Sequence, residues 1–476
     1  YAGSDSIEIT LDSTAPTLTL SDSDDDNLLA ASDTVTIIAD FDEAMTSTPT
    51  ISISGTSISN EEMTKIIGGL GKGSITLFPQ VYNNGNQYIP HLRTEGGGMY
   101  SGGLRVGLGG GKDDQIALSS DGTILAIGGY GKFNPASGYT EPKVDVYSWD
   151  GNDWTQLGQE IFGAPALNNN RFASSVSLSA NGTRMAVGAT LNSVGYVRIY
   201  DYDGNQWQQV EEISTTQVGN GLGESISLSA DGSTLVIGAA NHDLTNTGED
   251  GIVQVFEESQ NGDWVKKGSD ISRLSGGGFT IDSVRWFGSS VSSSSDGSII
   301  AIGANQGNQA FVYHWYNNDW TLLGGTIKGG NGPNLYTSRG VPYFGTTVSL
   351  SSDGTRIAVG AHSDRENVNF PGKVHIYDYT PTGVSSWTQV GAALNNAPYG
   401  DGFGHDVSLS ADGSLVAVGA PWTDGVKSNR GLVQIYSWNG NNWNQFGDDI
   451  FRDGYENSYF GSTVRLSGNG SKLAVV

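Results

Sequence analysis

The sequence predicts an all-β protein, a seven-bladed β-propeller preceded by an incomplete β-sandwich. Three observations lead to this fold class: one phrase recurs seven times, each copy alternates apolar and polar residues, and helical patterns are few. The first copy, residues 118–128, reads Leu-Ser-Ser-Asp-Gly-Thr-Ile-Leu-Ala-Ile-Gly, and residues 178–188 read Leu-Ser-Ala-Asn-Gly-Thr-Arg-Met-Ala-Val-Gly. The Asp-Gly or Asn-Gly pairs of the seven copies begin at residues 121, 181, 231, 296, 353, 412 and 469.

Each copy contains four short strands. In the copy around residue 412 we expect them at 403–409, 414–419, 432–437 and 443–446. Asp412-Gly413 joins the first pair and Asn439-Gly440-Asn441 joins the second, and both sequences favour tight hairpins with positive φ. Four antiparallel strands repeated radially form a β-propeller. A linear solenoid is less consistent with the repeats, because the sequence also contains segments that would close a ring, as described next.

The seventh copy supplies only its first two strands, 460–464 and 472–475. The missing outer pair has a counterpart upstream of the first copy, where residues 74–91 resemble the outer hairpins of other copies, such as 197–207. We therefore expect the N-terminal outer strands at 74–91 to close the ring by pairing with the C-terminal inner strands at 461–476.

Tryptophan is concentrated in the outer hairpins. Nine of the eleven tryptophans lie in or beside them, at positions 149, 154, 207, 264, 315, 320, 387, 438 and 443. Recurrence at one place in each copy is what packing between neighbouring blades requires. We interpret these residues as scaffold, with a row of sugar-binding side chains as the alternative.

A family resemblance rests on a second repeated pattern. Phe403-Gly404 followed by Gly419-Ala420-Pro421 resembles the FG-GAP repeat, and near copies begin at Phe287 and Phe344. The resemblance covers about residues 74–476 and implies a seven-bladed propeller similar to that of integrin α subunits. In that family some blades carry an Asp-x-Asp-x-Asp-Gly calcium loop. The turns here hold one acid at most, fewer oxygen ligands than Ca²⁺ prefers, so we do not expect calcium in the blades.

Residues 1–65 differ in composition from the propeller. They are rich in Ser, Thr and Asp, lack tryptophan, and predict strands at 6–11, 17–20, 34–38 and 50–54. The run Asp12-Ser-Thr-Ala-Pro16, with the segments 39–45 and 48–53, resembles bacterial-type Ig-like repeats. The expected domains are 1–14, the last strand of a preceding Ig-like domain; 15–65, a partial Ig-like domain; and 66–476, the propeller.

The Ig-like segment is too short to complete a sandwich of about 100 residues. Its missing strands would come from sequence beyond Val476, if the propeller is inserted into an Ig-like domain, or from a neighbouring chain by strand addition. No initiator Met or signal peptide precedes Tyr1, and we expect the chain to be a piece of something longer.

One acidic run lies in this segment. Asp22, Asp24, Asp25, Asp26 and Asn27 place five oxygen-bearing side chains within six residues. One interpretation is a Ca²⁺ site that stiffens the domain junction, the only cofactor that the sequence indicates. The alternative is a solvated acidic loop.

The connections between second and third strands, and those between copies, vary in length, whereas the hairpin turns stay short. In an antiparallel blade both variable sets emerge on one face, where binding residues are disproportionately found. Aromatic residues with amide and carboxylate neighbours on that face suit carbohydrate or protein recognition, unless they only pin their own loops. They are Tyr130, Phe133, Tyr139, Trp286, Tyr336, Tyr343, Phe370, Tyr399, Trp422, Tyr455 and Tyr459.

Motifs for catalysis are mostly missing, because the six histidines are scattered and neither a nucleophile elbow nor a phosphate loop occurs. His405 and Asp406 fall in an expected first strand. One interpretation is a polar site in the central channel, and the alternative is a structural histidine. Asn181-Gly-Thr183 and Asn469-Gly-Ser471 are glycosylation sequons, although Asn-Gly is also a preferred turn pair.

The formal net charge of -26 argues against binding to nucleic acid or anionic membranes, and no window approaches the roughly 20 apolar residues of a membrane span. We expect a non-enzymatic extracellular protein of the cell surface. Its propeller would be displayed on an Ig-like stalk and would serve adhesion or a larger surface fibre. The expected partners are copies of itself or other surface proteins, by strand complementation, and glycans. A carbohydrate-binding module is the alternative function, and a polysaccharide-active enzyme is a third.

Overall fold

The computed structural model divides into two compact units, residues 1–75 and 76–476. It describes the backbone of five short strands before residue 79 and, beyond them, most of the repeated region. The described ranges there are 116–134, 139–151, 153–163, 171–191, 194–214, 221–242, 250–272, 286–329, 343–362, 372–381, 386–395, 402–424, 430–451 and 459–476.

The N-terminal unit contains four described strands, β1 (Ser6–Ile9), β2 (Thr17–Ser21), β3 (Thr36–Asp40) and β4 (Ile51–Ser54), at the places the alternating pattern predicts. β1 pairs antiparallel with β4, and β2 pairs antiparallel with β3. These are two separate two-stranded sheets, so the described strands do not show an Ig-like sandwich. The boundaries at residues 14 and 65 stay predictions.

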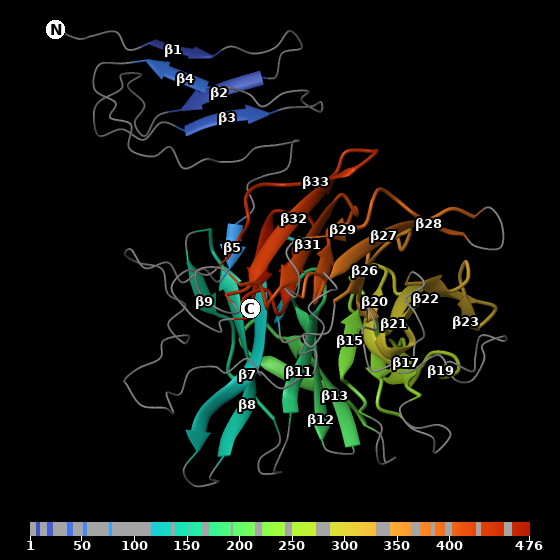
Figure 1. Cartoon of the computed structure of the whole chain (residues 1–476). Helices are drawn as coiled ribbons and strands as arrows, with labels where there is room; N and C mark the ends of the chain where they lie inside the picture. Colours follow the sequence, from blue (N-terminus) through green and yellow to red (C-terminus); the bar gives the residue numbers. More distant parts are fainter. Residues whose placement is uncertain are drawn as a thin grey trace. The chain divides into compact units, whose positions relative to one another are not determined.

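The second unit is an all-β propeller whose complete blades are antiparallel sheets of four or five strands (Figure 1). Blade 1 contains β6 (Ile116–Leu118), β7 (Ile124–Asn134), β8 (Tyr139–Trp149), β9 (Trp154–Gln156) and β10 (Ile161–Phe162). Blade 2 contains β11 (Arg171–Leu178), β12 (Arg184–Leu191), β13 (Val194–Tyr202) and β14 (Trp207–Ser214). Blade 3 contains β15 (Ser225–Leu228), β16 (Thr234–Ala239), β17 (Ile252–Glu258), β18 (Trp264–Lys266) and β19 (Ile271–Ser272).

The remaining blades repeat this order. Blade 4 contains β20 (Phe287–Ser293), β21 (Ile299–Ala304), β22 (Gln309–Tyr316), β23 (Asp319–Leu322) and β24 (Ile327–Lys328), with the short 3₁₀ helix η1 (Asn305–Gly307) after β21. Blade 5 contains β25 (Phe344–Leu350), β26 (Arg356–Ala361), β27 (Lys373–Tyr379), β28 (Trp387–Gln389) and β29 (Leu394–Asn395). Blade 6 contains β30 (Val407–Leu409), β31 (Leu415–Ala420), β32 (Leu432–Trp438) and β33 (Trp443–Gln445).

The expected count of seven blades is wrong for the described structure, which shows six. The seventh repeat forms a three-stranded sheet, here called the closing sheet, from β34 (Val464–Leu466), β35 (Lys472–Val475) and β5 (Thr76–Phe78). β5 pairs with β35 at the place the sequence predicts, but it runs parallel to β35, unlike the outer strand of a blade. Residues 79–91, which would supply the rest of an outer hairpin, lie outside the described residues.

The ring is closed by backbone hydrogen bonds between successive turns. The amide of Ser120 in blade 1 donates to the carbonyl of Ala180 in blade 2, and the same step recurs from blade to blade as far as the closing sheet. There the amide of Asn469 donates back to the carbonyl of Ser120 at 3.0 Å. Closure therefore depends on the inner turns of the repeats, because their groups meet around the whole circle.

The repeated glycines have a steric cause. Gly345, in the Phe-Gly pair of blade 5, has a φ of 87°, a conformation that glycine adopts without strain. Its carbonyl oxygen points at the backbone of blade 4, where a Cβ on Gly303 would lie 2.1 Å from that oxygen. The Phe-Gly and Gly-Ala pairs of neighbouring repeats are thus the two sides of one close contact between blades.

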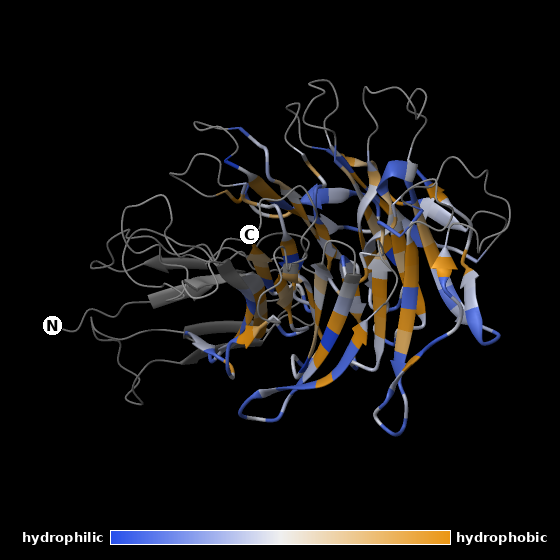
Figure 2. Cartoon of the chain, turned by 90° about the horizontal axis from the view of Figure 1, so that it is seen from below, coloured by the Kyte–Doolittle hydropathy of each residue, from blue (hydrophilic) through white to orange (hydrophobic). Residues whose placement is uncertain are grey.

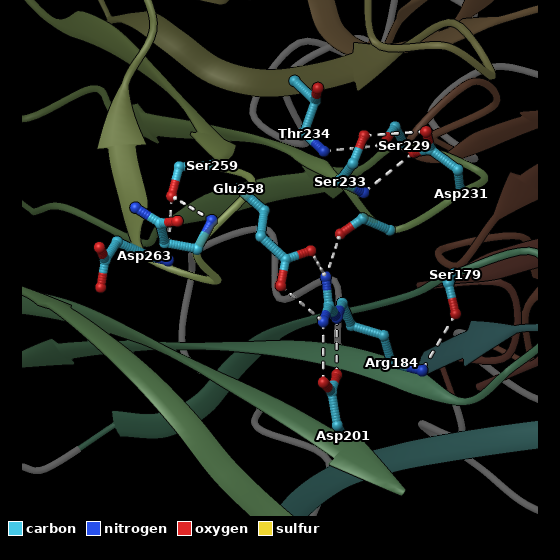
Figure 3. Close-up of polar contacts among 12 residues, drawn as sticks. Ser179, Arg184, Asp201, Ser229, Asp231, Ser233, Thr234, Glu258, Ser259 and Asp263 are labelled. Carbon is cyan, nitrogen blue, oxygen red and sulfur yellow. Dashed lines mark hydrogen bonds and ion pairs between the residues drawn. The ribbon is translucent and has the colours of Figure 1, made fainter.

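Each inner turn is held by a small hydrogen-bond network, drawn for blade 3 in Figure 3. Asp231 Oδ1 accepts hydrogen bonds from Ser229 Oγ at 2.6 Å and from the amide of Ser233 at 2.9 Å, while Ser229 Oγ accepts from the amide of Thr234. Asn181 takes the same place in blade 2. The single acid or amide of each turn is therefore engaged in shaping the hairpin.

An arginine joins blades 2 and 3 next to this turn (Figure 3). The Arg184 guanidinium donates to both oxygens of Asp201, at 2.6 and 2.8 Å, and also to Glu258 in the next blade. Its hydrogen bonds to Asp201, followed by those to Glu258, raise the pKa of Arg184 despite its partial burial. The arginine stays charged and fastens two blades together.

The outer-hairpin tryptophans pack between blades, as predicted. Trp207 is buried, lies across from Tyr202 with ring centroids 5.3 Å apart, and donates its indole N–H to the carbonyl of Leu157 in blade 1. Trp320 and Trp387 make the same hydrogen bond to their preceding blades. Hydrophobic residues follow the blade strands and hydrophilic residues occupy the hairpin ends (Figure 2). Among the described residues, no helix is long and apolar enough to cross a membrane.

Candidate binding face

The strand order gives the propeller two unlike faces. The turns between first and second strands, and those between third and fourth, share one side, here called the turn face. The connections between second and third strands, and those between blades, share the other, here called the loop face. The turn face repeats one hydrogen-bonded turn, whereas the loop face differs from blade to blade, so residues for recognition are expected on the loop face.

At the entry to several first strands the loop face holds backbone strain. The residue before the Phe-Gly or Leu-Gly pair has a positive φ, and glycine occupies this position at Gly221 and Gly402. Three other repeats place a bulky aromatic residue there: Trp286 with φ 57°, Tyr343 with φ 46° and Tyr459 with φ 51°. Each costs roughly 1–2 kcal/mol relative to a relaxed backbone. Such outliers are found where a side chain is needed at a particular place.

Four half-buried rings lie in contact on the loop face over blades 5 and 6, and are here called the ring cluster: Tyr343, His362, His405 and Trp422. His362 is stacked on Tyr343 with ring centroids 5.3 Å apart and planes 10° apart. The edge-on ring of Trp422 lies 5.6 Å from His362 and 5.3 Å from His405. The two imidazole centroids are 5.3 Å apart.

The repeat positions of the four residues explain why they meet. Tyr343 directly precedes β25 and His362 directly follows β26, while His405 follows the Phe-Gly pair of blade 6. Trp422 lies two residues beyond β31 and packs on the backbone of Gly402, where a Cβ would be 2.4 Å from the indole. The neighbouring blades 5 and 6 thus bring residues about 80 positions apart to one place.

His405 is anchored by the segment that precedes β34. Its Nδ1 lies 3.1 Å from the carbonyl oxygen of Ser462, and because a carbonyl only accepts, Nδ1 carries the proton in this contact. A hydrogen bond of this kind fixes both the tautomer and the ring orientation.

Asp406, beside His405, holds three sheets together. It is 6% exposed, and its Oδ1 accepts from Thr347 Oγ1 at 3.0 Å. Its Oδ2 accepts from the amide of Val464 at 2.9 Å and from the Arg465 guanidinium at 2.7 Å. Both residues precede β30, which begins at Val407, so the expectation that they lie within a first strand is wrong.

Several sequence-predicted residues can be located and others cannot. Trp286 and Trp422 lie on the loop face, half-buried. Tyr130 and Tyr139 lie in β7 and β8, where only the backbone is described. Tyr336, Tyr399 and Tyr455, and the acidic residues Asp22, Asp24, Asp25, Asp26 and Asn27, lie outside the described residues. In the part of the chain that is described, no group of three or more His, Asp or Glu could hold a metal ion.

The sequons of Asn181 and Asn469 both lie in exposed turns of the turn face. In each case Oδ1 accepts the hydrogen bonds that shape the turn, so these bonds do not use the amide nitrogen to which a glycan would be attached. Glycosylation stays a prediction.

Sequence reasoning did not single out His362 as a site residue. Its signal was the alignment of repeats, because His362 occupies the place of Pro421 after the Gly-Ala pair, and His405 occupies the place of Thr346 after the Phe-Gly pair. Positions that carry unlike residues within otherwise similar repeats mark the elaborated part of the ring.

Comparison with known proteins supports the FG-GAP resemblance over one part of the chain. Residues 392–436 match the family model described as the FG-GAP repeat. No curated protein matches the chain.

Several solved structures are similar in fold. They include the β-propeller domain of Myceliophteria thermophila Cps50 (Swd1), with 11% identity, 76% of this chain and 92% of that chain covered, and a TM-score of 0.47. The periplasmic gluconolactonase PpgL of Pseudomonas aeruginosa has 16% identity, coverage of 71% and 88%, and a TM-score of 0.46. A putative 6-phosphogluconolactonase of Bacteroides fragilis has 13% identity, coverage of 76% and 87%, and a TM-score of 0.45.

Proposed function

We propose that this chain is a non-enzymatic extracellular adhesion protein, with its propeller displayed on an N-terminal Ig-like stalk within a larger surface fibre or assembly. One observation carries the proposal. The turn face repeats a single hydrogen-bonded motif, whereas the loop face holds bulky aromatic residues on strained backbone at three equivalent positions. A surface that retains aromatic residues at this cost suits recognition of a partner.

The acid that follows His405 in the chain favours binding over catalysis. Asp406 is held by Thr347, by the amide of Val464 and by the Arg465 guanidinium. Acid or base catalysis would require this carboxylate to exchange a proton with a substrate. Its hydrogen bonds instead engage it in the packing of three sheets.

Antibody labelling of intact and permeabilised cells that produce the protein tests its location. We expect an antibody against the propeller to label intact cells, and beads coated with the full chain to adhere to those cells. Asn205→Ala, an exposed position on the turn face, is the control and should leave adhesion unchanged. Labelling that requires permeabilisation would refute the proposal.

A carbohydrate-binding module is the second candidate. The specific observation in its favour is the ring cluster, in which four half-buried rings, two of them imidazoles, lie together on the loop face. Calcium binding at the acidic run and strand complementation between copies belong to the adhesion proposal.

A further inference from the structure

We infer that the ring cluster is a stacking site for a neutral sugar ring of a glycan. The inference rests on the proposed adhesion role of the loop face and names the ligand of one place on it. Tyr343, His362, His405 and Trp422 supply the site, and blades 5 and 6 carry it.

The first argument is the backbone of Tyr343. Its φ of 46° is unfavourable for a tyrosine, and the equivalent positions 221 and 402 show that glycine meets the same requirement without strain. The chain instead holds a tyrosine whose ring is stacked, with planes 10° apart, on His362. Because glycine would relieve this backbone strain, we take the tyrosine side chain to be the reason that the strain is kept.

The second argument is the shape of the cluster. All four residues are half-buried, so each keeps part of its surface open to solvent. Trp422 rests on Gly402, and His405 is tied to the Ser462 carbonyl. The rings are not coplanar, because the indole stands edge-on to both imidazoles while the tyrosine ring is stacked on one of them. The cluster therefore combines apolar ring carbons with the polar groups of imidazole and phenol. The apolar C–H face of a pyranose and its surrounding hydroxyls match those two features.

The third argument is charge. The only buried acid beside the cluster in the described residues is Asp406, and its charge is balanced by Arg465 at 2.7 Å. The chain as a whole carries a formal charge of -26, which repels anionic ligands such as sulfated or sialylated glycans. A neutral ligand avoids that repulsion and requires no counter-ion. The cluster therefore favours neutral sugars over acidic ones.

A printed glycan array probed with the full chain tests the inference, followed by calorimetric titration of the best-binding neutral oligosaccharide. We expect Trp422→Ala and Tyr343→Gly each to lower the affinity about tenfold, as loss of one ring contact would. Tyr343→Gly also removes the backbone strain, so the variant should fold, and its thermal midpoint confirms this. Tyr316→Ala, which removes a 57% exposed aromatic residue of the outer hairpin of blade 4, is the matched control.

In the binding assays, three results would overturn the inference: no saturable binding to any neutral glycan, a preference for anionic glycans, or unchanged affinity in both cluster variants. Its failure is distinguishable from that of the adhesion role. If beads coated with Trp422→Ala and Tyr343→Gly proteins still adhere to cells, adhesion stands and the sugar site falls. Adhesion lost on protease treatment of the target cells, but not on periodate oxidation of their glycans, would assign the loop face to a protein partner and also overturn the sugar site.

Discussion

Replacement of Gly303 by alanine tests the steric account of the repeats. The new Cβ would lie 2.1 Å from the carbonyl oxygen of Gly345, whereas real Cβ atoms essentially never come within 3.0 Å of a neighbour. The two blades must therefore separate by about 0.9 Å at this point, and because both partners are backbone in hydrogen-bonded sheets, no side chain can move aside. Because neither backbone can yield, the cost lies at the upper end of the roughly 1–3 kcal/mol that overpacking incurs, about 3 kcal/mol. Alanine also restricts the unfolded chain, which returns about 0.4–1 kcal/mol.

The matched control is Gly440→Ala. Gly440 has a φ of 92° and no atom within 4 Å of its would-be Cβ, so this variant reports backbone strain alone, about 1 kcal/mol after the same unfolded-state correction. At an unfolding entropy of roughly 2 cal/mol/K per residue, 1 kcal/mol lowers the midpoint of this large unit by about 1 °C. Scanning calorimetry should show a drop of about 2–3 °C for Gly303→Ala and about 1 °C for Gly440→Ala. Equal drops would refute the idea that the interblade carbonyl requires glycine at position 303.

Further predictions concern charge. In a denaturant titration, Arg356→Ala should destabilise the propeller by about 2 kcal/mol, because it removes two hydrogen bonds to Asp378 and one to the carbonyl of Gly413 in the next blade. The control Lys266→Ala removes an exposed ion pair and should cost less than about 0.5 kcal/mol in the same titration. Partial burial pushes the pKa of Asp353 upward, but hydrogen bonds from Ser351 and Thr355 lower it overall. Its stabilising contribution is therefore present above the unfolded pKa near 3.8 and is lost as the pH falls through the lower folded pKa. Asparagine takes this place at position 181, so Asp353→Asn should leave the unfolding midpoint at pH 7 nearly unchanged. The decline of that midpoint below pH 4 should be shallower in the variant. An equally steep decline would count against this account. Millimolar calcium should raise the unfolding midpoint of the N-terminal unit, and Asp24→Asn with Asp25→Asn should abolish that rise; no rise in the native chain would favour the solvated acidic loop.

Strand existence and type followed from local pattern. The alternation of apolar residues predicted β26 and β31, and the Asp-Gly pairs marked their hairpins, because both signals depend only on neighbouring residues. The role of Trp207 was also predictable, since its recurrence in the repeat indicates a position that every blade boundary requires.

The blade count was less accessible. Counting copies gave seven, yet the last copy forms the closing sheet, in which β5 runs parallel to β35. Pairing between segments nearly 400 residues apart depends on how the ring brings them together, and a short apolar strand does not specify the direction of its partner.

The composition, the seven repeats and the glycine pairs determined an all-β propeller from sequence alone, because each repeat carries its own strands and the same contact to the next. Only the tertiary structure decided which of the scattered aromatic residues and histidines meet. His362 and His405 are 43 positions apart in the chain and touch because two blades place their loop-face ends side by side. Tyr343 contacts His362 from a left-handed backbone conformation that no local sequence pattern predicts, since glycine occupies the equivalent position in other repeats. The fold therefore follows from short sequence patterns that repeat along the chain, whereas the candidate site forms only when the blades pack together.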